Sequence, residues 1–149
     1  MNMPKRLNIK NLIPDAYQQL IQLSQFVANA GIDPLQQELI KIRASQLNGC
    51  AYCLDIHTRE ALKHGENPRR LAVLSAWREA EDWFSEEDKV ILKLTEELTI
   101  VANHGLSEET YNQVVGCFGE MMTANLIMAV ISINSLNRLG ISQRLHPTS

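Results

Sequence analysis

The chain has 149 residues, of which 45% are hydrophobic and 21% charged, as is ordinary for one globular domain with a single buried core. Its formal net charge is -3, and its Lys and Arg residues are scattered among the acids, which argues against nucleic acid as a partner. The opening MNMPKRLNIKNLIP has no apolar stretch after its basic residues, and no run approaches the ~18 apolar residues of a membrane span, so we expect a cytoplasmic protein with no membrane partner.

Helix signals recur along the chain, with little sign of strands. The first predicted helix covers about residues 14 to 29, because Pro14 suits the first position of a helix and apolar residues follow it at helical spacing. The second begins at Pro34 and continues until Asn48 and Gly49 interrupt it.

Four further helix starts follow this interruption. A third helix runs from it through Lys63, and Pro68 opens a fourth, through RRLAVLSAWREA. Ser85 with Asp88 three residues later resembles a capping box, which predicts a fifth helix in KVILKLTEELTIVANHG. Ser107 and the acids after it mark the start of a sixth.

The last predicted helix covers roughly residues 120 to 138 and is apolar almost all the way round. Such a helix needs cover on every side, either in the core or between subunits. The chain has no clear linker, low-complexity segment or internal repeat. We therefore predict an all-α protein with a single domain over residues 1–149, built from six or seven helices.

The segment QLNGCAYCLDIHTREALKHG contains the candidate functional residues. Three cysteines are too few for a disulfide-stapled scaffold, but two form a Cys-x-x-Cys pair, which in a cytosolic chain indicates redox or metal chemistry. On a helix, Cys50, Cys53 and His57 share one face. Cα atoms three residues apart lie about 5 Å from each other, within the disulfide range. If Asn48 caps this helix, both thiols lie in its first turns, where a thiolate is favoured.

A histidine that acts as a base usually needs a third group to orient it. His57, one turn beyond Cys53, is placed to accept its proton or to hold a relay water. Glu38, on the preceding predicted helix, is the candidate orienting group, because a carboxylate beside the apolar Leu39 and Ile42 is costly unless it is paired. Most glutamates are exposed, however, so the sequence leaves open that this side chain points at water.

The stretch ELIKIRASQLNGCAYCLDIH, residues 38 to 57, resembles the active-site signature of the AhpD-like alkylhydroperoxidases, in the carboxymuconolactone decarboxylase superfamily. The segments FSEEDKVILKLTEELT and INSLNRLG resemble later helices of that family more loosely. The resemblance implies an all-helical, oligomeric enzyme, without a metal or organic cofactor, that reduces hydroperoxides through its two cysteines.

Carried across position by position, the resemblance implies that Cys53 is the peroxidatic thiolate, that Cys50 resolves it, and that His57 with Glu38 forms a proton relay. Cys53 would become a sulfenic acid, with which Cys50 condenses to a disulfide. An external dithiol, lipoyl-type or thioredoxin-like, would then restore the pair. In the best-known members a histidine precedes the second cysteine, whereas Tyr52 stands there in this sequence. A phenol is a poor base near neutral pH, so this difference concerns efficiency and substrate range.

Other interpretations of these residues compete with the redox one. Zinc is a rival because two cysteines, His57 and Glu38 are four ligands of permitted types, although no second ligand pair stands at finger spacing. Covalent haem is excluded, because Leu54 stands where Cys-x-x-Cys-His attachment requires histidine. The paired cysteines can also be small core side chains. We expect Cys117, which has apolar neighbours and no histidine at helical spacing, to be a core residue.

Two other classes of protein remain open. The decarboxylase branch of the superfamily shares the fold without depending on Cys-x-x-Cys, so a relative with an unknown small-molecule substrate is an alternative. A disulfide oxidoreductase with another substrate, or a dithiol that senses oxidants, would use the same residues. Turnover separates these, because a sensor oxidises once and stops. In each case we expect a homo-oligomer, because the apolar surface of the last helix is large for one chain to bury.

Overall fold

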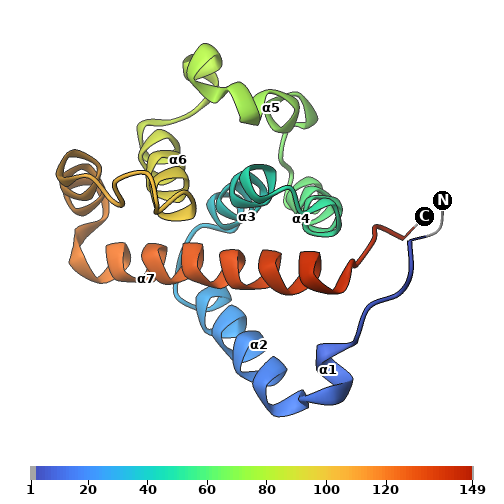
Figure 1. Ribbon diagram of the computed structural model, residues 1–149. Coiled ribbons are helices and arrows are strands. Elements are labelled where there is room, and N and C mark those ends of the chain that lie inside the picture. Colours follow the sequence, from blue (N-terminus) through green and yellow to red (C-terminus); the bar gives the residue numbers. More distant parts are fainter. Residues whose placement is uncertain (1–2, 149) are drawn as a thin grey trace.

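The structure, a computed structural model, describes residues 3–148 and contains helices but no strands over that range. The elements are α1 (Ile9–Leu12), α2 (Pro14–Ala28), α3 (Pro34–Asn48), α4 (Ala51–Lys63), α5 (Pro68–Val73), the 3-10 helix η1 (Leu74–Trp83), α6 (Glu86–Thr99) and α7 (Glu108–Gln143). In Figure 1, α7 crosses the molecule, with α2 on one side and α3, α4 and α6 on the other. Helix α3 packs against α4, α6 and α7. The all-α prediction is confirmed.

Five helices begin where the sequence predicts. Pro14, Pro34 and Pro68 are the first residues of α2, α3 and α5. At the start of α6, the Ser85 hydroxyl accepts a hydrogen bond from the backbone N–H of Asp88, and the Asp88 carboxylate accepts one from the N–H of Ser85, each at 3.1 Å. At the start of α7, the Ser107 hydroxyl accepts from the N–H of Thr110 at 3.1 Å. These caps satisfy backbone donors that a helix start leaves without partners.

The single helix expected after Pro68 is wrong in its second half. Helix α5 ends at Val73, and the chain continues as η1, with non-helical backbone at Ala76 and Ala80. Side chains three residues apart lie on the same side of a 3-10 helix. Leu74 and Trp77 have this spacing and both are buried. The packing of these two large side chains therefore overrides the local helical pattern.

The last two predicted helices meet within α7. Gly119 has φ 77° and ψ 168°, a conformation that glycine adopts readily and other residues rarely, so it divides α7 into residues 108–118 and residues 120–143. This break confirms the helix start predicted near residue 120. The second part continues past residue 138 to Gln143, where Arg144 in the left-handed conformation caps it.

One face of α7 lies at the centre of the core. Leu126, Val130 and Ile133 are buried against residues of α2, α3 and α6. Among the described residues, α7 is the one helix whose length and mean hydropathy would suffice to cross a membrane, although polar residues such as Asn125 and Ser132 interrupt its apolar runs. A core helix meets the same criteria. Met121 and Ile131 are exposed in the single chain. The chain itself therefore buries only part of the apolar surface of α7, although the sequence predicts burial on every side.

Candidate active site

The cysteine pair lies at the start of α4, directly after the turn that ends α3. Gly49 in this turn has φ 70°, in the left-handed region that favours glycine. The structure corrects the expected cap, because Cys50 and not Asn48 is the N-cap residue of α4. The Cys50 Sγ accepts a hydrogen bond from the backbone N–H of Cys53 at 3.3 Å. A thiolate at Cys50 would be stabilised by this donor and by the helix N-terminus.

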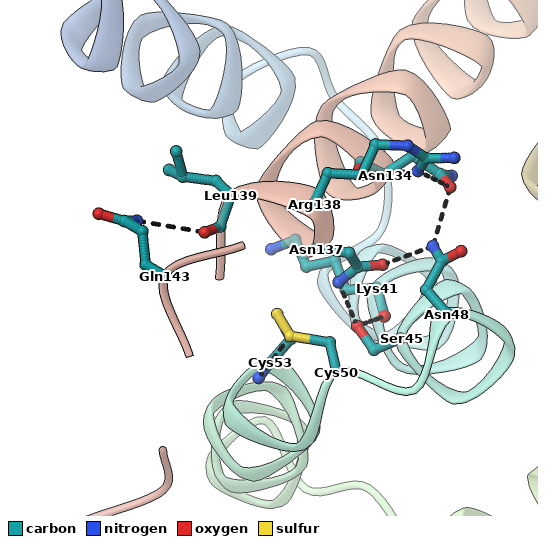
Figure 2. The surroundings of a disulfide bond; sticks show 10 residues. All are labelled: Lys41, Ser45, Asn48, Cys50, Cys53, Asn134, Asn137, Arg138, Leu139 and Gln143. Carbon is teal, nitrogen blue, oxygen red and sulfur yellow. Dashed lines mark hydrogen bonds between the residues drawn. A yellow bond between two sulfur atoms is a disulfide. The ribbon is translucent and has the colours of Figure 1, made fainter. Parts of the chain in front are cut away.

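Cys50 and Cys53 are joined by a disulfide bond, and their Cα atoms are 5.3 Å apart. This separation lies in the range that the helical spacing predicts. Both side chains are buried, with exposed fractions of 2% and 5%. Figure 2 shows the disulfide facing the last turns of α7, which carry Asn137 and Gln143. The protein itself therefore shields the sulfur atoms from solvent.

His57 on α4 and Glu38 on α3 face each other. The Nδ1 atom of His57 lies 3.0 Å from Oε2 of Glu38. Because Glu38 is only 5% exposed, the interpretation in which its side chain points at water is wrong. A carboxylate at this distance holds the proton on Nδ1, which leaves Nε2 as the nitrogen able to accept one. His57 follows Cys53 by one helical turn, so the imidazole and the disulfide occupy neighbouring positions on α4.

Lys41 belongs to this site, although the sequence interpretation missed it. Its Nζ lies 2.9 Å from Oε1 of Glu38, one turn earlier on α3. Burial raises the pKa of the Glu38 carboxyl, but the hydrogen bond with His57 and the charge of Lys41 outweigh burial, so the pKa lies below its ordinary value of 4.5. Glu38 is therefore charged at neutral pH and can stabilise an imidazolium. The i, i+3 spacing of the two residues is the signal that could have revealed the pair.

A small cavity of about 20 Å³ borders His57 and Lys41, which is room for about one water molecule. Its wall includes the polar side chains of Ser24, Gln37 and Ser132 and the apolar side chains of Val27, Ile40, Ala129, Ile133 and Leu136. One water or a molecule of similar size fits beside the imidazole, with hydrogen-bond partners around it.

A polar network joins the end of α3 to α7 (Figure 2). The Asn48 side-chain amide donates to Oδ1 of Asn134 and to Oδ1 of Asn137, each at 2.9 Å. The Asn137 amide donates to the Ser45 hydroxyl at 2.9 Å, and that hydroxyl donates to the carbonyl oxygen of Lys41 at 2.6 Å. Asn137 and Ser45 are fully buried. The network fixes the turn that precedes the disulfide, and no local sequence pattern predicts it, because its members meet only once α7 lies on α3.

The geometry also tests the other interpretations of the cysteines. Cys50 and Cys53 are bonded to each other and are not independent core side chains. Within residues 3–148, no three His, Cys, Asp or Glu side chains gather in a group able to hold a metal ion, so the zinc interpretation has no geometric support. Cys117 is exposed, and the expectation of a core residue is wrong. Together with Trp77 and Lys93, it lines a surface groove.

Comparison with known proteins identifies the family. Residues 14–97, more than half of the chain, match the Carboxymuconolactone decarboxylase family. The uncharacterized protein YdfG of Bacillus subtilis (strain 168) is 34% identical over 140 residues, which are 94% of this chain and 95% of that protein. The chain therefore belongs to the carboxymuconolactone decarboxylase family and is AhpD-like. The alkyl hydroperoxide reductase AhpD of Maricaulis maris (strain MCS10) is 44% identical over 39 residues, 26% of this chain and 22% of that protein.

Solved structures share the fold. The crystal structure of ATU0492 from Agrobacterium tumefaciens, a protein of unknown function and a candidate antioxidant defence protein AhpD, matches with a TM-score of 0.92 and 27% identity, over 98% of this chain and 100% of that chain. The debrominase Bmp8, in its apo form, matches with a TM-score of 0.80 and 16% identity, over 91% of this chain and 73% of that one. At that identity the debrominase shares the fold alone, and it shows that this fold serves more than one chemistry.

Proposed function

We propose that this protein is a thiol-dependent peroxidase that reduces alkyl hydroperoxides through the Cys50–Cys53 pair. The observation that carries the proposal is the disulfide at the start of α4, together with the Glu38–His57 pair one turn along the same helix. A Cys-x-x-Cys alone would fit many functions. A buried carboxylate that orients a histidine beside the second cysteine is the arrangement expected of a thiol that has to be deprotonated.

The reaction begins with the reduced dithiol. The Cys53 thiolate attacks the distal oxygen of the hydroperoxide, the O–O bond breaks, and the alkoxide takes a proton and leaves as an alcohol. Cys53 is then a sulfenic acid. The Cys50 sulfur displaces its hydroxyl as water and forms the disulfide. An external dithiol supplies two electrons and two protons to restore both thiols and becomes a disulfide itself.

The arrangement of charges supports these steps. His57 would take the thiol proton of Cys53 at Nε2 and later deliver it to the leaving alkoxide. Glu38, held charged by Lys41, would stabilise the imidazolium formed in between. The backbone N–H that reaches the Cys50 Sγ would favour a thiolate at that cysteine, which makes it a good leaving group when the external dithiol attacks the disulfide.

We also propose that the protein acts as a cytoplasmic homo-oligomer, supplied with electrons by a lipoyl-type or thioredoxin-like dithiol. The exposed apolar side chains Met121, Ile131 and Ile141 on α7 support an interface between copies. Sedimentation at micromolar concentration tests this part separately, because a purely monomeric protein would contradict it.

The experiment that tests the function is a count of hydroperoxide molecules consumed per subunit in the presence of excess dithiol. A peroxidase consumes many equivalents, and we expect that result. Consumption that stops at one equivalent would identify a sensor. No consumption of hydroperoxide by a pair that still exchanges electrons with an added disulfide would point to a disulfide oxidoreductase or another superfamily activity.

A further inference from the structure

We propose that Gly140 is a positioning residue that sets the redox equilibrium of the Cys50–Cys53 pair, because its missing side chain leaves the space into which the sulfur atoms separate on reduction. The inference rests on the proposed function in one respect: the pair has to interconvert between disulfide and dithiol. It adds a determinant on α7, far along the chain from the cysteine motif.

Gly140 lies directly against the disulfide. A Cβ atom at this position would lie 3.5 Å from the Sγ of Cys50 and 3.8 Å from the Sγ of Cys53. Gly140 is itself buried, and the two cysteines are 2% and 5% exposed. The backbone of α7 at residue 140 is therefore part of the wall that encloses both sulfur atoms.

The backbone conformation does not explain a glycine at this position. Gly140 is not among the residues with positive φ, and it lies within the helical part of α7. Alanine is the better helix former at such a position. What glycine supplies here is space next to the sulfur atoms.

Reduction changes how much of that space is needed. An external dithiol breaks the S–S bond, adds two electrons and two protons to the pair, and is itself oxidised to a disulfide. Bonded sulfurs are about 2 Å apart, whereas the two thiols have to move apart to a non-bonded distance. A Cβ at position 140 would make ordinary contact with the bonded pair but would occupy room that the separating sulfurs use. An alanine should therefore disfavour the dithiol relative to the disulfide.

The turn that carries Gly140 is held in place. The carbonyl oxygen of Gly140 accepts a hydrogen bond from the N–H of Leu145 at 3.0 Å, which closes the end of α7. Gln143 accepts at its Oε1 from the backbone N–H of Ile9 at 2.6 Å, so the N-terminal segment is joined to the same turn. Because the end of α7 is anchored in this way, it should not shift aside to make room for an added methyl group.

The test compares Gly140→Ala with the wild type and with Gly116→Ala as a matched control. Gly116 is also a helical glycine of α7, but nothing lies within 4 Å of a Cβ added there. Each protein is equilibrated in mixtures of reduced and oxidised dithiothreitol without peroxide, and the reduced fraction is measured by mass after alkylation. We expect the equilibrium constant for reduction of Gly140→Ala to fall about tenfold, which for a two-electron couple is about 30 mV more negative. Gly116→Ala should match the wild type.

An equilibrium constant for Gly140→Ala within about twofold of the wild type, or a shift in the opposite direction, would overturn the proposal. Thermal unfolding of both redox forms provides a second readout. The free energy of unfolding of the reduced variant should fall, relative to that of the oxidised variant, by the amount that corresponds to the same tenfold change. An oxidised variant that fails to fold would also contradict it, because the oxidised site accepts the added carbon at ordinary distances. Failure of the proposed function looks different: the reduced wild type would consume no peroxide, and the equilibrium comparison would be unaffected.

Discussion

The Nδ1 atom of His57 lies 3.0 Å from the Oε2 atom of Glu38, and this contact joins α4 to α3 beside the redox pair. It gives the histidine a fixed orientation and a buried negative charge to oppose the proton that it accepts. The contact therefore has a stabilising role in the fold and a proposed role in proton transfer, and the two roles have separate consequences.

The first prediction concerns stability and pH in Glu38→Gln. The pKa of the Glu38 carboxyl is below its ordinary value of 4.5, so the charged carboxyl stabilises the fold fully above about that pH. This stabilisation is lost as the pH falls through the lower pKa of the folded state. Glu38→Gln lacks this titration, so its free energy of unfolding should fall less steeply with acid than that of the wild type, as measured by urea unfolding across the acid range.

At about pH 7, the same substitution should cost about 1–3 kcal/mol, because it weakens two partly buried, charge-assisted hydrogen bonds. Glu120→Gln is the control, since Glu120 is exposed and its substitution should change stability by less than about 0.5 kcal/mol. Parallel acid profiles for the wild type and Glu38→Gln would show that the carboxyl makes no linked contribution.

The second prediction follows from Lys41. Its charge is one cause of the lowered pKa of Glu38, so Lys41→Met should raise that pKa. The stabilisation due to the carboxylate would then be lost at a higher pH than in the wild type. Acid unfolding monitored by circular dichroism should show the midpoint moving to higher pH. A midpoint that moves to lower pH would contradict the assigned direction.

The third prediction separates the two cysteines. Cys53→Ser should abolish peroxide reduction, whereas Cys50→Ser should still react once and accumulate a sulfenic acid or a mixed disulfide. His57→Gln should slow the oxidation without preventing disulfide formation. Mass spectrometry after a single addition of peroxide distinguishes these products. Equal and mild effects from both cysteine changes would refute the assigned roles.

The fourth prediction concerns Asn137, which joins the turn before the disulfide to α7. Asn137→Ala leaves the Ser45 hydroxyl and the Asn48 amide short of a partner in a buried site, so we expect a loss of about 1–3 kcal/mol in unfolding free energy. Ser135→Ala on the same helix is the control, because its hydroxyl bonds only the carbonyl oxygen of Ile131 near the surface, and its effect should stay below about 0.5 kcal/mol. Similar losses in both variants would show that the network adds nothing specific.

Local signals were enough to predict most helices of this fold. The capping box of Ser85 and Asp88 and the glycine at position 119 act within a few residues, so the sequence alone places the helix ends beside them. The short helix α1 was missed, and the stretch after Val73 was assigned wrongly. There the burial of Trp77 decides the backbone, and burial depends on residues of other helices.

The site, too, has some residues that local sequence signals predict and others that only the packing of distant helices brings in. The row of Cys50, Cys53 and His57 follows from helical spacing. Glu38 follows from the cost of an unpaired carboxylate beside apolar residues, and the likeness to a known signature supports it. Gly140 and Asn137 lie far from these residues in the sequence and join the site only through the packing of α7 on α3 and α4. Cys50 and not Asn48 caps α4, because Asn48 is still the last residue of α3.

The measurement that tests the central claim most directly is multiple-turnover consumption of an organic hydroperoxide with excess dithiol, by the wild type and Cys53→Ser, after metal removal with a chelator. We expect turnover by the wild type to survive chelation and to be lost in Cys53→Ser, because the reaction depends on the thiol pair. Turnover that persists in Cys53→Ser, or that disappears from the wild type on chelation, would contradict a metal-free cysteine peroxidase.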